Sequence, residues 1–394
     1  GAVAAHKCGQ YNDLLGDICL ASRTRSKCEK IITGIREKGN LKDTGKKLSA
    51  KQVDAGEIDN VVRLIKETGS EIVINVGTAF VNMPILDACI ETGAAYIDTA
   101  VHEEVEVVNA DYPWYAEFEW KRRSLCEQNK VTAVLGAGFD PGVVNAYSAY
   151  ALKHEFDKIN EIDIMDVNSG DHGKFFATNF DPEINLREIV EQVGYWEDRQ
   201  WKECEHHSRS MEYDFPEVGR HKLYLMGHDE VHSLSVNLDV DAVRFWMGFS
   251  DHYINCFNVL ENIGLLNHNT VTTAEGLEVV PLKVLKACLP DPASLAPGYT
   301  GKTCIGNLIK GKKDGREKKI FIYNICDHQQ CYKDVESQAI SYTAGVPPVA
   351  TALLIADGRW DVQAMKNVEE LDPDPFLELL GTMGLPTETQ TLIS

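Results

Sequence analysis

The segment Leu135–Asn145, LGAGFDPGVVN, has the composition of a turn that binds an anion. It includes the end of a short apolar stretch typical of a buried strand, and Gly136 and Gly138 permit a tight turn with a close backbone approach. Asp140 is a favoured N-cap residue, and Pro141 suits the first turn of a helix. Because a helix N-terminus offers unpaired N–H groups and the positive end of a dipole, we expect an anion to bind here.

The place of this turn along the chain indicates which anion to expect. A glycine turn in the first βαβ unit of a Rossmann domain holds a pyrophosphate, but this turn follows several strand–helix units. We therefore expect it to face a substrate carboxylate or the nicotinamide end of a cofactor. Asp140, Gly142 and Asn145 are the candidate substrate-binding residues. The alternative is an ordinary strand-to-helix turn that binds no ligand.

The first twenty residues resemble the second half of a βαβ unit. Gly1 is followed by a helical stretch, and residues 17–21 have the composition of a strand. Gly1 is therefore expected to be the last glycine of a phosphate loop of the form G-x-G-x-x-G. Since that motif normally begins roughly ten residues earlier, we expect the natural protein to contain the missing strand and glycines.

The turn after this strand predicts the cofactor. NAD-binding sites usually carry an acidic side chain there, which bonds the ribose 2′-hydroxyl. This chain has Ser22, Arg23 and Thr24 instead, with Lys27 close behind. A guanidinium pairs with a 2′-phosphate and stacks on adenine, so the turn predicts NADP(H). A solvated basic turn at the start of a helix is the alternative.

Further strands with intervening helices predict a parallel sheet covered on both faces. These strands are expected at residues 47–54, 71–75, 95–99 and 132–135. Ligands bind at the carboxyl ends of such strands. The polar residues expected to contact the cofactor there are Asp54, Asn75, Gly77, Thr78 and Thr99. Asp98 also lies at a strand end, where it is either a catalytic group or a simple cap.

The second half of the chain shows alternating apolar and polar residues, which predict a mixed, largely antiparallel sheet. The expected fold class is α/β, with a Rossmann-type doubly wound sheet and a second α/β domain. The first domain is expected to span residues 1–144 and to be completed by 337–394, with 145–336 forming the second domain. Within 337–394, the apolar segment 337–356 is expected to pack against the first domain, and the last thirty residues to form a surface tail with a rigid turn at Asp372–Pro375.

The net charge, the apolar runs and the cysteine content of the chain argue against several classes of function. The net charge of −21 argues against nucleic-acid binding, and no apolar run of eighteen residues predicts a membrane span. The eleven dispersed cysteines favour buried thiols in a reducing cytoplasm. Cys326, His328 and Cys331 match no zinc spacing, so no metal is expected.

Three segments together resemble the saccharopine dehydrogenase family of reductases. They are the turn at Ser22–Thr24, the segment GAGFDPGVVNAY at 136–147 and SYTAGVPPVATALL at 341–354. The central segments, among them MDVNSGDHGKFFATNFDPE at 165–183 and HDEV at 228–231, resemble one branch of it. That resemblance implies that a diamine, 1,3-diaminopropane or putrescine, condenses with L-aspartate β-semialdehyde, and that NADPH reduces the imine. It also implies a homodimer joined through the second domain.

Imine reduction suggests roles for further residues. The cationic iminium should be lined by carboxylates, for which Asp98, Asp140 and Asp171 are candidates, and His172 could move a proton. The substrate carboxylate needs donors such as Arg209 or Arg244. The far ammonium of a diamine needs an acidic or aromatic partner. The possible partners are Trp114, Trp246, Asp229 and Glu230.

Two other functions remain open from the sequence. A saccharopine reductase would use glutamate and a six-carbon aldehyde, and its pocket should hold more arginines than this chain clusters together. A Rossmann protein that only senses NADP would keep the Ser22–Thr24 turn but would lack polar groups beside the nicotinamide. The expected partners are small-molecule substrates and a second copy of the chain.

Overall fold

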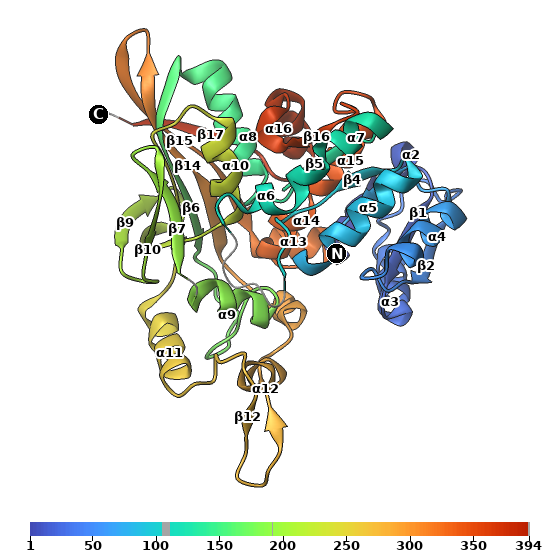
Figure 1. Ribbon diagram of the computed structural model, residues 1–394, viewed down its shortest axis with the longest axis horizontal. Helices are drawn as coiled ribbons and strands as arrows, with labels where there is room; N and C mark the ends of the chain where they lie inside the picture. The colour runs from blue at the N-terminus through green and yellow to red at the C-terminus, as the bar shows by residue number, and fades with distance from the viewer. Residues whose placement is uncertain (105–110, 191, 393–394) are drawn as a thin grey trace.

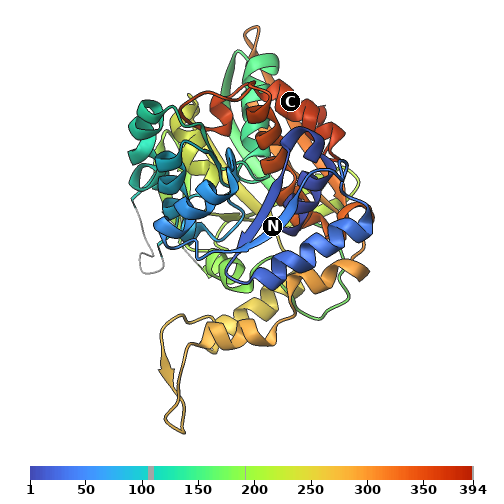
Figure 2. The same ribbon diagram turned by 90° about the vertical axis from the view of Figure 1, so that its right-hand side faces the viewer.

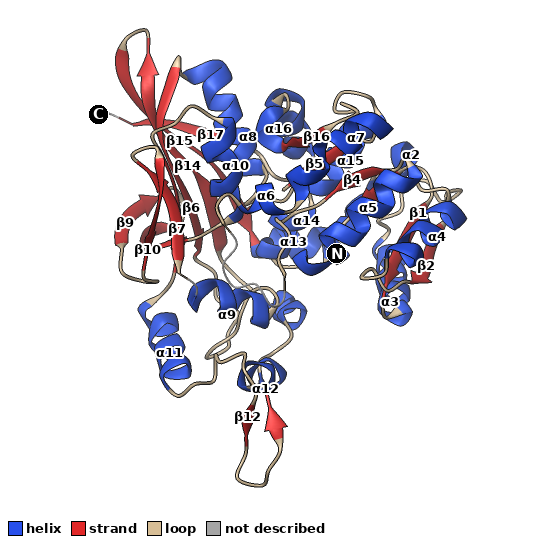
Figure 3. Cartoon of the chain, viewed as in Figure 1, coloured by secondary structure: helices blue, strands red, loops and turns tan. Residues whose placement is uncertain are grey.

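A parallel sheet and a mixed sheet organise this chain in the computed structural model, which describes residues 1–104, 111–190 and 192–392 (Figure 1). We call the elements around the parallel sheet the first domain and those around the mixed sheet the second domain. Helices α8, α10, α13 and α14 lie between the two sheets (Figure 3). The predicted α/β fold class is confirmed.

The first domain contains only parallel strands, in two groups. One group pairs β1 with β2, and the other has the order β16-β5-β4-β3. The strands are β1 (Ile18–Ser22), β2 (Leu48–Gln52), β3 (Ile72–Ile74), β4 (Ala95–Ile97), β5 (Ala133–Leu135) and β16 (Met365–Asn367). The strands predicted at 47–54, 71–75, 95–99 and 132–135 are therefore confirmed.

Helices alternate with these strands, as the apolar spacing predicts. Gly39, Gly69 and Gly93 end three of them in the left-handed conformation that glycine adopts without strain. The helical elements are α1 (Ala2–Gln10), α2 (Asn12–Leu15), α3 (Arg25–Lys38), α4 (Ile58–Thr68), η1 (Ala79–Val81), α5 (Asn82–Thr92), α6 (Trp114–Glu117), η2 (Glu119–Arg122) and α7 (Arg123–Asn129).

The second domain is built on a sheet of order β17-β15-β14-β6-β11-β10-β9, with β7 and β8 attached to β11. Among the strand pairs described for this sheet, β6 with β11 is the parallel one, and the others are antiparallel. The long hairpin of β14 and β15 turns at Asp314 and Gly315, both of which have positive φ. The strands are β6 (Lys158–Asn168), β7 (Val193–Glu197), β8 (Gln200–Cys204), β9 (Ser210–Phe215), β10 (Gly219–Met226), β11 (Ala242–Gly248), β14 (Lys302–Lys313), β15 (Arg316–Asp327) and β17 (Glu388–Leu392).

The remaining elements cover this sheet or project from it. Figures 1 and 2 show the small hairpin β12–β13 extending away from the body, beyond α11 and α12. Its strands are β12 (Val271–Thr272) and β13 (Glu278–Val279). The helical elements are α8 (Val143–Tyr150), η3 (Ala151–Glu155), α9 (Pro182–Val190), α10 (Asp229–Asn237), α11 (Asp251–Asn262), α12 (Pro281–Cys288), η4 (Pro292–Gly298), α13 (His328–Val335), α14 (Ala339–Gly345), α15 (Pro347–Ala356), η5 (Val368–Glu370) and α16 (Pro373–Thr382).

The apolar segment after the mixed sheet joins the two domains. Nine of the ten residues of α15 are buried, and the helix packs against β3 and β4. The prediction that this segment buries itself against the first domain is confirmed. Ala339–Ala356 is long and apolar enough to cross a membrane, but 78% of this stretch is buried inside the protein. This degree of burial is typical of helices in a protein core.

The prediction of a surface tail at the C-terminus is wrong. Residues 365–367 form β16 in the parallel sheet, and 388–392 form β17 at the edge of the mixed sheet. The predicted turn at Asp372–Pro375 is the start of α16, where Asp372 accepts a hydrogen bond from the Asp374 backbone N–H. Asp followed by Pro is a favoured helix start, and the apolar side of α16 then packs on α8 and α15.

A buried polar cluster ties α1 to the second domain. The ammonium of Lys7, only 3% exposed, lies 2.6 Å from the Asp334 carboxylate and 2.9 Å from the carbonyl oxygen of Met383. Gln10 and Tyr342 also donate to Asp334. A buried ammonium is stable only when paired, so this contact fixes α1 against α13 and α14.

We predict that Asp334→Asn lowers the free energy of unfolding by about 2–3 kcal/mol, because Lys7 keeps a buried charge without a counter-ion. Asp13→Asn, which removes an exposed ion pair with Lys42, should have a much smaller effect, because solvent screens that pair. Urea unfolding of both variants measures the difference. Equal effects of the two substitutions would contradict the role given to Lys7.

Candidate functional site

The predicted cofactor residues lie at the carboxyl edge of the parallel strands. Ser22 ends β1, Asp54 follows β2, Asn75 follows β3, and Thr99 follows β4. Gly77 and Thr78 continue the loop after β3. Ligands of open α/β sheets bind at this edge, so the predicted set occupies one suitable place in the fold.

The turn after β1 is ordered by its own hydroxyl. The Ser22 Oγ accepts from the Thr24 backbone N–H at 3.2 Å, and Gln52 donates its amide to the carbonyl oxygen of Arg23. The side chains of Arg23 and Lys27 are exposed and form no ion pair within the described chain. Both cations are therefore available to an anionic group.

The loops after β2 and β3 use their polar side chains internally. The Asp54 carboxylate accepts from the Gly56 backbone N–H at 3.2 Å. Asn75 is buried, donates to the Asn82 side chain at 2.7 Å and accepts from the Gly77 N–H at 3.1 Å. These side chains shape the edge on which a cofactor would lie. Gly1, at the N-terminus of α1, lies beside Val76 of the same loop.

The loop after β5 differs from the sequence expectation. The helix α8 begins at Val143, and its N-cap is Gly142, whose N–H donates to the Asn145 side chain at 2.8 Å; Asp140 is not the cap. The N–H groups of Val143 and Val144 bond to carbonyl oxygens of Gly138 and Phe139. The expectation of unpaired N–H groups at this helix start is therefore wrong for these three residues, because the loop folds back onto them.

This loop requires glycine at position 142. Gly142 has a φ of +134°, and a Cβ there would lie 2.1 Å from the carbonyl oxygen of Gly138. The Asn145 amide also donates to Glu369 at 2.9 Å and to Ser233 at 3.2 Å. Gly142 and Asn145 thus hold the shape of the loop, and of the three substrate residues predicted in this loop only Asp140 is partly exposed.

Asp140 belongs to a group of acidic side chains at the boundary of the two domains, which we call the acid cluster. Asp166 comes from the end of β6, and three consecutive residues come from the start of α10. The cluster consists of Asp98, Asp140, Asp166, His228, Asp229 and Glu230. It is linked to the first domain because the Asp229 carboxylate accepts from the Val101 N–H at 2.8 Å.

His228 is the cation of the acid cluster. Its Nδ1 lies 2.5 Å from the Glu230 carboxylate, and its ring stacks on Phe245 with centroids 3.9 Å apart. Burial alone would lower the pKa of His228, but Glu230, Asp140 and Asp229 outweigh it and raise that pKa well above its ordinary value. The acidic neighbours of His228 therefore favour its protonated form.

Burial places several carboxyl groups of the cluster near neutrality. It raises the pKa of Asp166 to about 7, although His228 partly offsets it, and it raises the pKa of Asp229 to about 7 in the same way. The pKa of Asp98 also rises to about 7 through burial, while the Gly136 N–H, 2.6 Å away, opposes the shift. Burial, then Asp166, raises the pKa of Asp140 well above the usual range. Groups that titrate near pH 7 can accept and return a proton.

Several buried oxygen atoms in or beside the cluster have no hydrogen-bond partner in the described chain. They include Asp98 Oδ2, Glu230 Oε1 and the hydroxyl of Tyr115. Buried polar atoms are nearly always bonded, so unpaired oxygens beside several carboxyl groups suit a cationic ligand with N–H donors. The arrangement can hold an ammonium or iminium and exchange protons with it.

Other predicted residues lie outside the acid cluster. Asp171 is exposed and accepts from the Gly173 N–H at 2.7 Å. His172 accepts from the Lys174 N–H and makes an edge contact with Tyr299, and burial lowers its pKa. These contacts shape the loop after β6 and do not reach the cluster.

The two predicted arginines are already paired with carboxylates. Arg244 donates to Asp163, Glu197 and Glu161 at 2.7, 2.9 and 2.5 Å. Arg209 lies 3.4 Å from Glu197 and over the ring of Tyr195. A guanidinium that neutralises acidic side chains of the sheet is not available to a substrate carboxylate. The structure therefore gives both residues a role within the second domain.

Sequence reasoning missed His228 and Asp166. Asp166 stands at the end of an alternating strand, and His228 precedes two acidic residues at a helix start. Such polar residues at element ends are common, and only the fold brings these two together.

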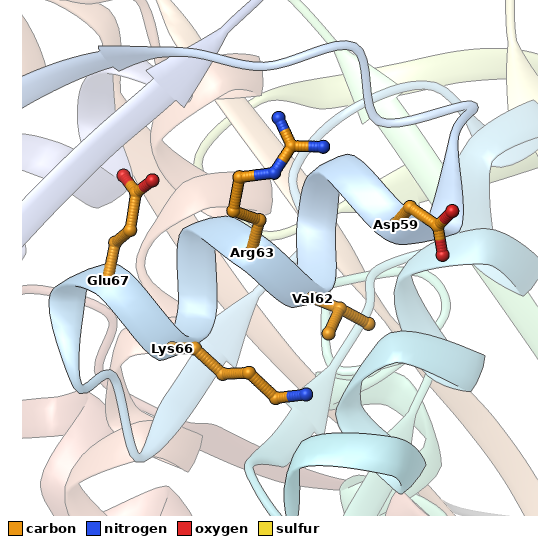
Figure 4. A pocket seen from close by; sticks show the side chains of 5 residues that line it. All are labelled: Asp59, Val62, Arg63, Lys66 and Glu67. Atoms are coloured by element: carbon orange, nitrogen blue, oxygen red, sulfur yellow. The ribbon is translucent and has the colours of Figure 1, made fainter.

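Two further features of the structure concern metal ions and a surface pocket. Within the described ranges, no three His, Cys, Asp or Glu side chains are grouped to hold a metal ion. A pocket on α4 is lined by Asp59, Val62, Arg63, Lys66 and Glu67 (Figure 4). It contains no member of the acid cluster, and its Lys66 and Glu67 already pair with charged side chains of α5 and β2.

Comparison with known proteins gives two family matches that together span most of the chain. The saccharopine dehydrogenase NADP binding domain matches residues 1–134, and the saccharopine dehydrogenase C-terminal domain matches 138–385. A carboxynorspermidine synthase from Vibrio alginolyticus is 52% identical, covering 100% of this chain and 95% of the relative. A carboxyaminopropylagmatine dehydrogenase from Synechocystis sp. is 44% identical, covering 98% and 94%.

Solved structures show the same fold at low identity. A saccharopine dehydrogenase (L-Glu forming) from Saccharomyces cerevisiae aligns with a TM-score of 0.70 and 11% identity, covering 100% of this chain and 98% of the other. A homospermidine synthase from Legionella pneumophila, in complex with NAD, aligns with a TM-score of 0.69 and 12% identity, covering 100% and 90%.

The raised pKa of Asp229 predicts a pH-dependent stability. Its folded pKa of about 7 lies above the ordinary 3.8, so the folded state binds the extra proton between these values. The free energy of unfolding of the wild type should therefore fall, relative to Asp229→Asn, as pH rises from about 4 to 7. The slope of this fall should be at most about 1.4 kcal/mol per pH unit, the value for one proton.

Chemical unfolding at several pH values measures this difference. Asp239→Asn serves as the control, because the Arg199 guanidinium lowers the pKa of that exposed carboxyl. The stability that Asp239 contributes is lost only as pH falls below its ordinary pKa of 3.8, so the difference between the wild type and Asp239→Asn should stay constant from about pH 4 to 7. A pH-independent difference for Asp229→Asn would contradict the raised pKa.

Proposed function

The chain belongs to the saccharopine dehydrogenase family, and we propose that it is an NADPH-dependent reductase of polyamine biosynthesis. It joins L-aspartate β-semialdehyde to 1,3-diaminopropane or putrescine and forms carboxynorspermidine or carboxyspermidine. The acid cluster carries the proposal, because carboxyl groups gathered at the carboxyl edge of the sheet suit a diamine and the cationic iminium derived from it.

The residues at the sheet edge fit NADP(H). The exposed, unpaired Arg23 and Lys27 suit a 2′-phosphate, and the N-terminus of α1 at Gly1 lies beside the loop after β3, where a helix dipole favours pyrophosphate. The cofactor supplies the hydride that reduces the carbon–nitrogen double bond. The chain supplies binding, orientation and proton transfer.

Condensation requires a proton acceptor and then a proton donor. The amine arrives as an ammonium and must lose a proton before it attacks the aldehyde carbon, and the resulting carbinolamine loses water when its hydroxyl is protonated. Overall, ammonium, aldehyde, NADPH and one proton give a secondary ammonium, water and NADP⁺. We assign the role of proton acceptor to Asp166, which is partly exposed and has a pKa of about 7. The role of proton donor is assigned to the protonated His228.

The other members of the cluster hold the cation. Asp140 and Asp229 are partly exposed beside His228, and Glu230 Oε1 is unpaired. Asp98 is fully buried and bonded to the Gly136 N–H, so we assign it to positioning the loop after β5. Asp171 and His172 are not part of this assignment.

We also place this enzyme in the cytoplasm as a homodimer. All eleven cysteines are free thiols in the structure, as a reducing compartment maintains them. Saccharopine formation is the less favoured activity, because L-glutamate brings two carboxylates to a site that is itself acidic. Agmatine is a further amine to test, given the name of the relative in Synechocystis.

The substrate assay follows NADPH absorbance with L-aspartate β-semialdehyde and one amine at a time. We expect oxidation with 1,3-diaminopropane or putrescine, and at most a small rate with L-glutamate and a six-carbon semialdehyde. Turnover with the glutamate pair alone would overturn the proposal. NADPH binding without turnover of any amine would instead indicate a sensor.

The turn after β1 predicts the cofactor preference. Arg23→Ala should lower kcat/KM for NADPH about 10- to 100-fold and leave that for NADH within about twofold, because only NADPH carries the 2′-phosphate. Arg36→Ala, in the last turn of α3, removes an equally exposed arginine and should change neither value. A similar loss with both cofactors in Arg23→Ala would refute the 2′-phosphate contact.

A further inference from the structure

The substrate carboxylate still lacks a partner once Arg209 and Arg244 are assigned to the sheet. Five arginines in the described residues are partly buried, and four of them form ion pairs. Arg187, in α9, is the fifth. No hydrogen bond or ion pair within the described chain uses its guanidinium, which lies over the Phe80 ring at 5.8 Å from the centroid. In Figure 1, α9 lies at the lower end of the mixed sheet.

Residues 101–103 connect Arg187 with the acid cluster. The Val101 N–H donates to the Asp229 carboxylate at 2.8 Å, and the His102 Nδ1 lies 2.9 Å from the carbonyl oxygen of Ala79. Glu103 follows His102 and Phe80 follows Ala79, so the second contact joins the chain segment of Glu103 to the segment whose Phe80 ring lies under the Arg187 guanidinium. Since a chain extends by at most about 3.5 Å per residue, Glu103 and Val101 lie within about 7 Å of each other.

Glu103 and Arg187 form an electrostatic pair without direct contact. Burial raises the pKa of Glu103, and the charge of Arg187 partly lowers it. Yet no nitrogen–oxygen distance between them is 4 Å or less in the structure. The two opposite charges thus influence each other without forming an ion pair, so each is left to pair with the opposite charge of an amino-acid head group.

We propose that Arg187 binds the α-carboxylate of the amino-acid semialdehyde and Glu103 binds its α-ammonium. This assignment rests on the proposed function and names the residues that select its aldehyde substrate. The short side chain of the semialdehyde then points its aldehyde toward Asp229 and the rest of the acid cluster. Arginine is needed because the cluster would otherwise repel the carboxylate.

Two substrate analogues separate the contributions of these residues. The first, 3-aminopropanal, lacks the carboxylate; the second, 4-oxobutanoate, lacks the ammonium. Arg187→Met should raise KM for L-aspartate β-semialdehyde about 10- to 100-fold and leave the rate with 3-aminopropanal nearly unchanged. Arg187→Lys should recover part of the loss, because it keeps the charge but not the planar fork.

Glu103→Gln should show the complementary pattern. Its KM for L-aspartate β-semialdehyde should rise about tenfold, whereas the rate with 4-oxobutanoate should stay the same or increase. In both variants the KM values for NADPH and for the diamine should change less than twofold. Arg63→Met, which removes an exposed arginine of α4 (Figure 4), is the matched control and should change none of these constants.

The outcomes distinguish this inference from the proposed function. If the wild type reduces no imine from any diamine, the proposed function fails. If the wild type is active but Arg187→Met slows 3-aminopropanal and the semialdehyde equally, the residue acts through structure alone and the inference fails. An unchanged KM for the semialdehyde in Arg187→Met would also overturn it.

Discussion

Carboxyl groups removed from water within range of one another are the constraint on which this site depends. Burial disfavours each charged form and outweighs the opposing effect of His228 or of the Gly136 N–H, so the pKa values of Asp98, Asp166 and Asp229 rise to about 7. A bound ammonium or iminium removes much of that penalty and makes the ionised forms favourable. Amine binding therefore changes the protonation of these carboxyl groups, and their protonation in turn changes how well the amine binds.

Such a cluster requires a scaffold that does not relax around it. Its members come from strand ends and a helix start in two domains, and the two domains must keep the same relative position. The buried helix α15 packs under β3 and β4, and the Lys7–Asp334 pair holds α1 against α13. The C-terminal segment adds β16 to one sheet and β17 to the other. Because separating the domains would break all of these contacts, the carboxyl groups stay together despite their repulsion.

The sequence predicted the elements well because local patterns determine them. Apolar stretches followed by polar turns located β1 to β5, and Ser22–Thr24 marked the turn at the sheet edge. Asp140 was misassigned because a favoured N-cap residue two positions before the true cap, Gly142, gives the same local signal. The pairing of Arg244 with three acidic side chains could not be predicted either, since all three lie on strands at least 47 residues away in the sequence. His228 and Asp166 were missed for the same reason.

The charge distribution explains how an acidic enzyme can still bind anions. The net charge of −21 attracts a diamine at long range but opposes NADPH and a semialdehyde carboxylate. Long-range repulsion of this kind is screened by salt within about 10 Å, whereas contacts at hydrogen-bond distance are not. Cations that form no ion pair within the described residues, such as Arg23 and Arg187, can therefore bind anions locally while the overall field still favours the amine. Arginines already paired within the fold, such as Arg244, cannot serve this purpose, because a substrate would have to displace their carboxylates.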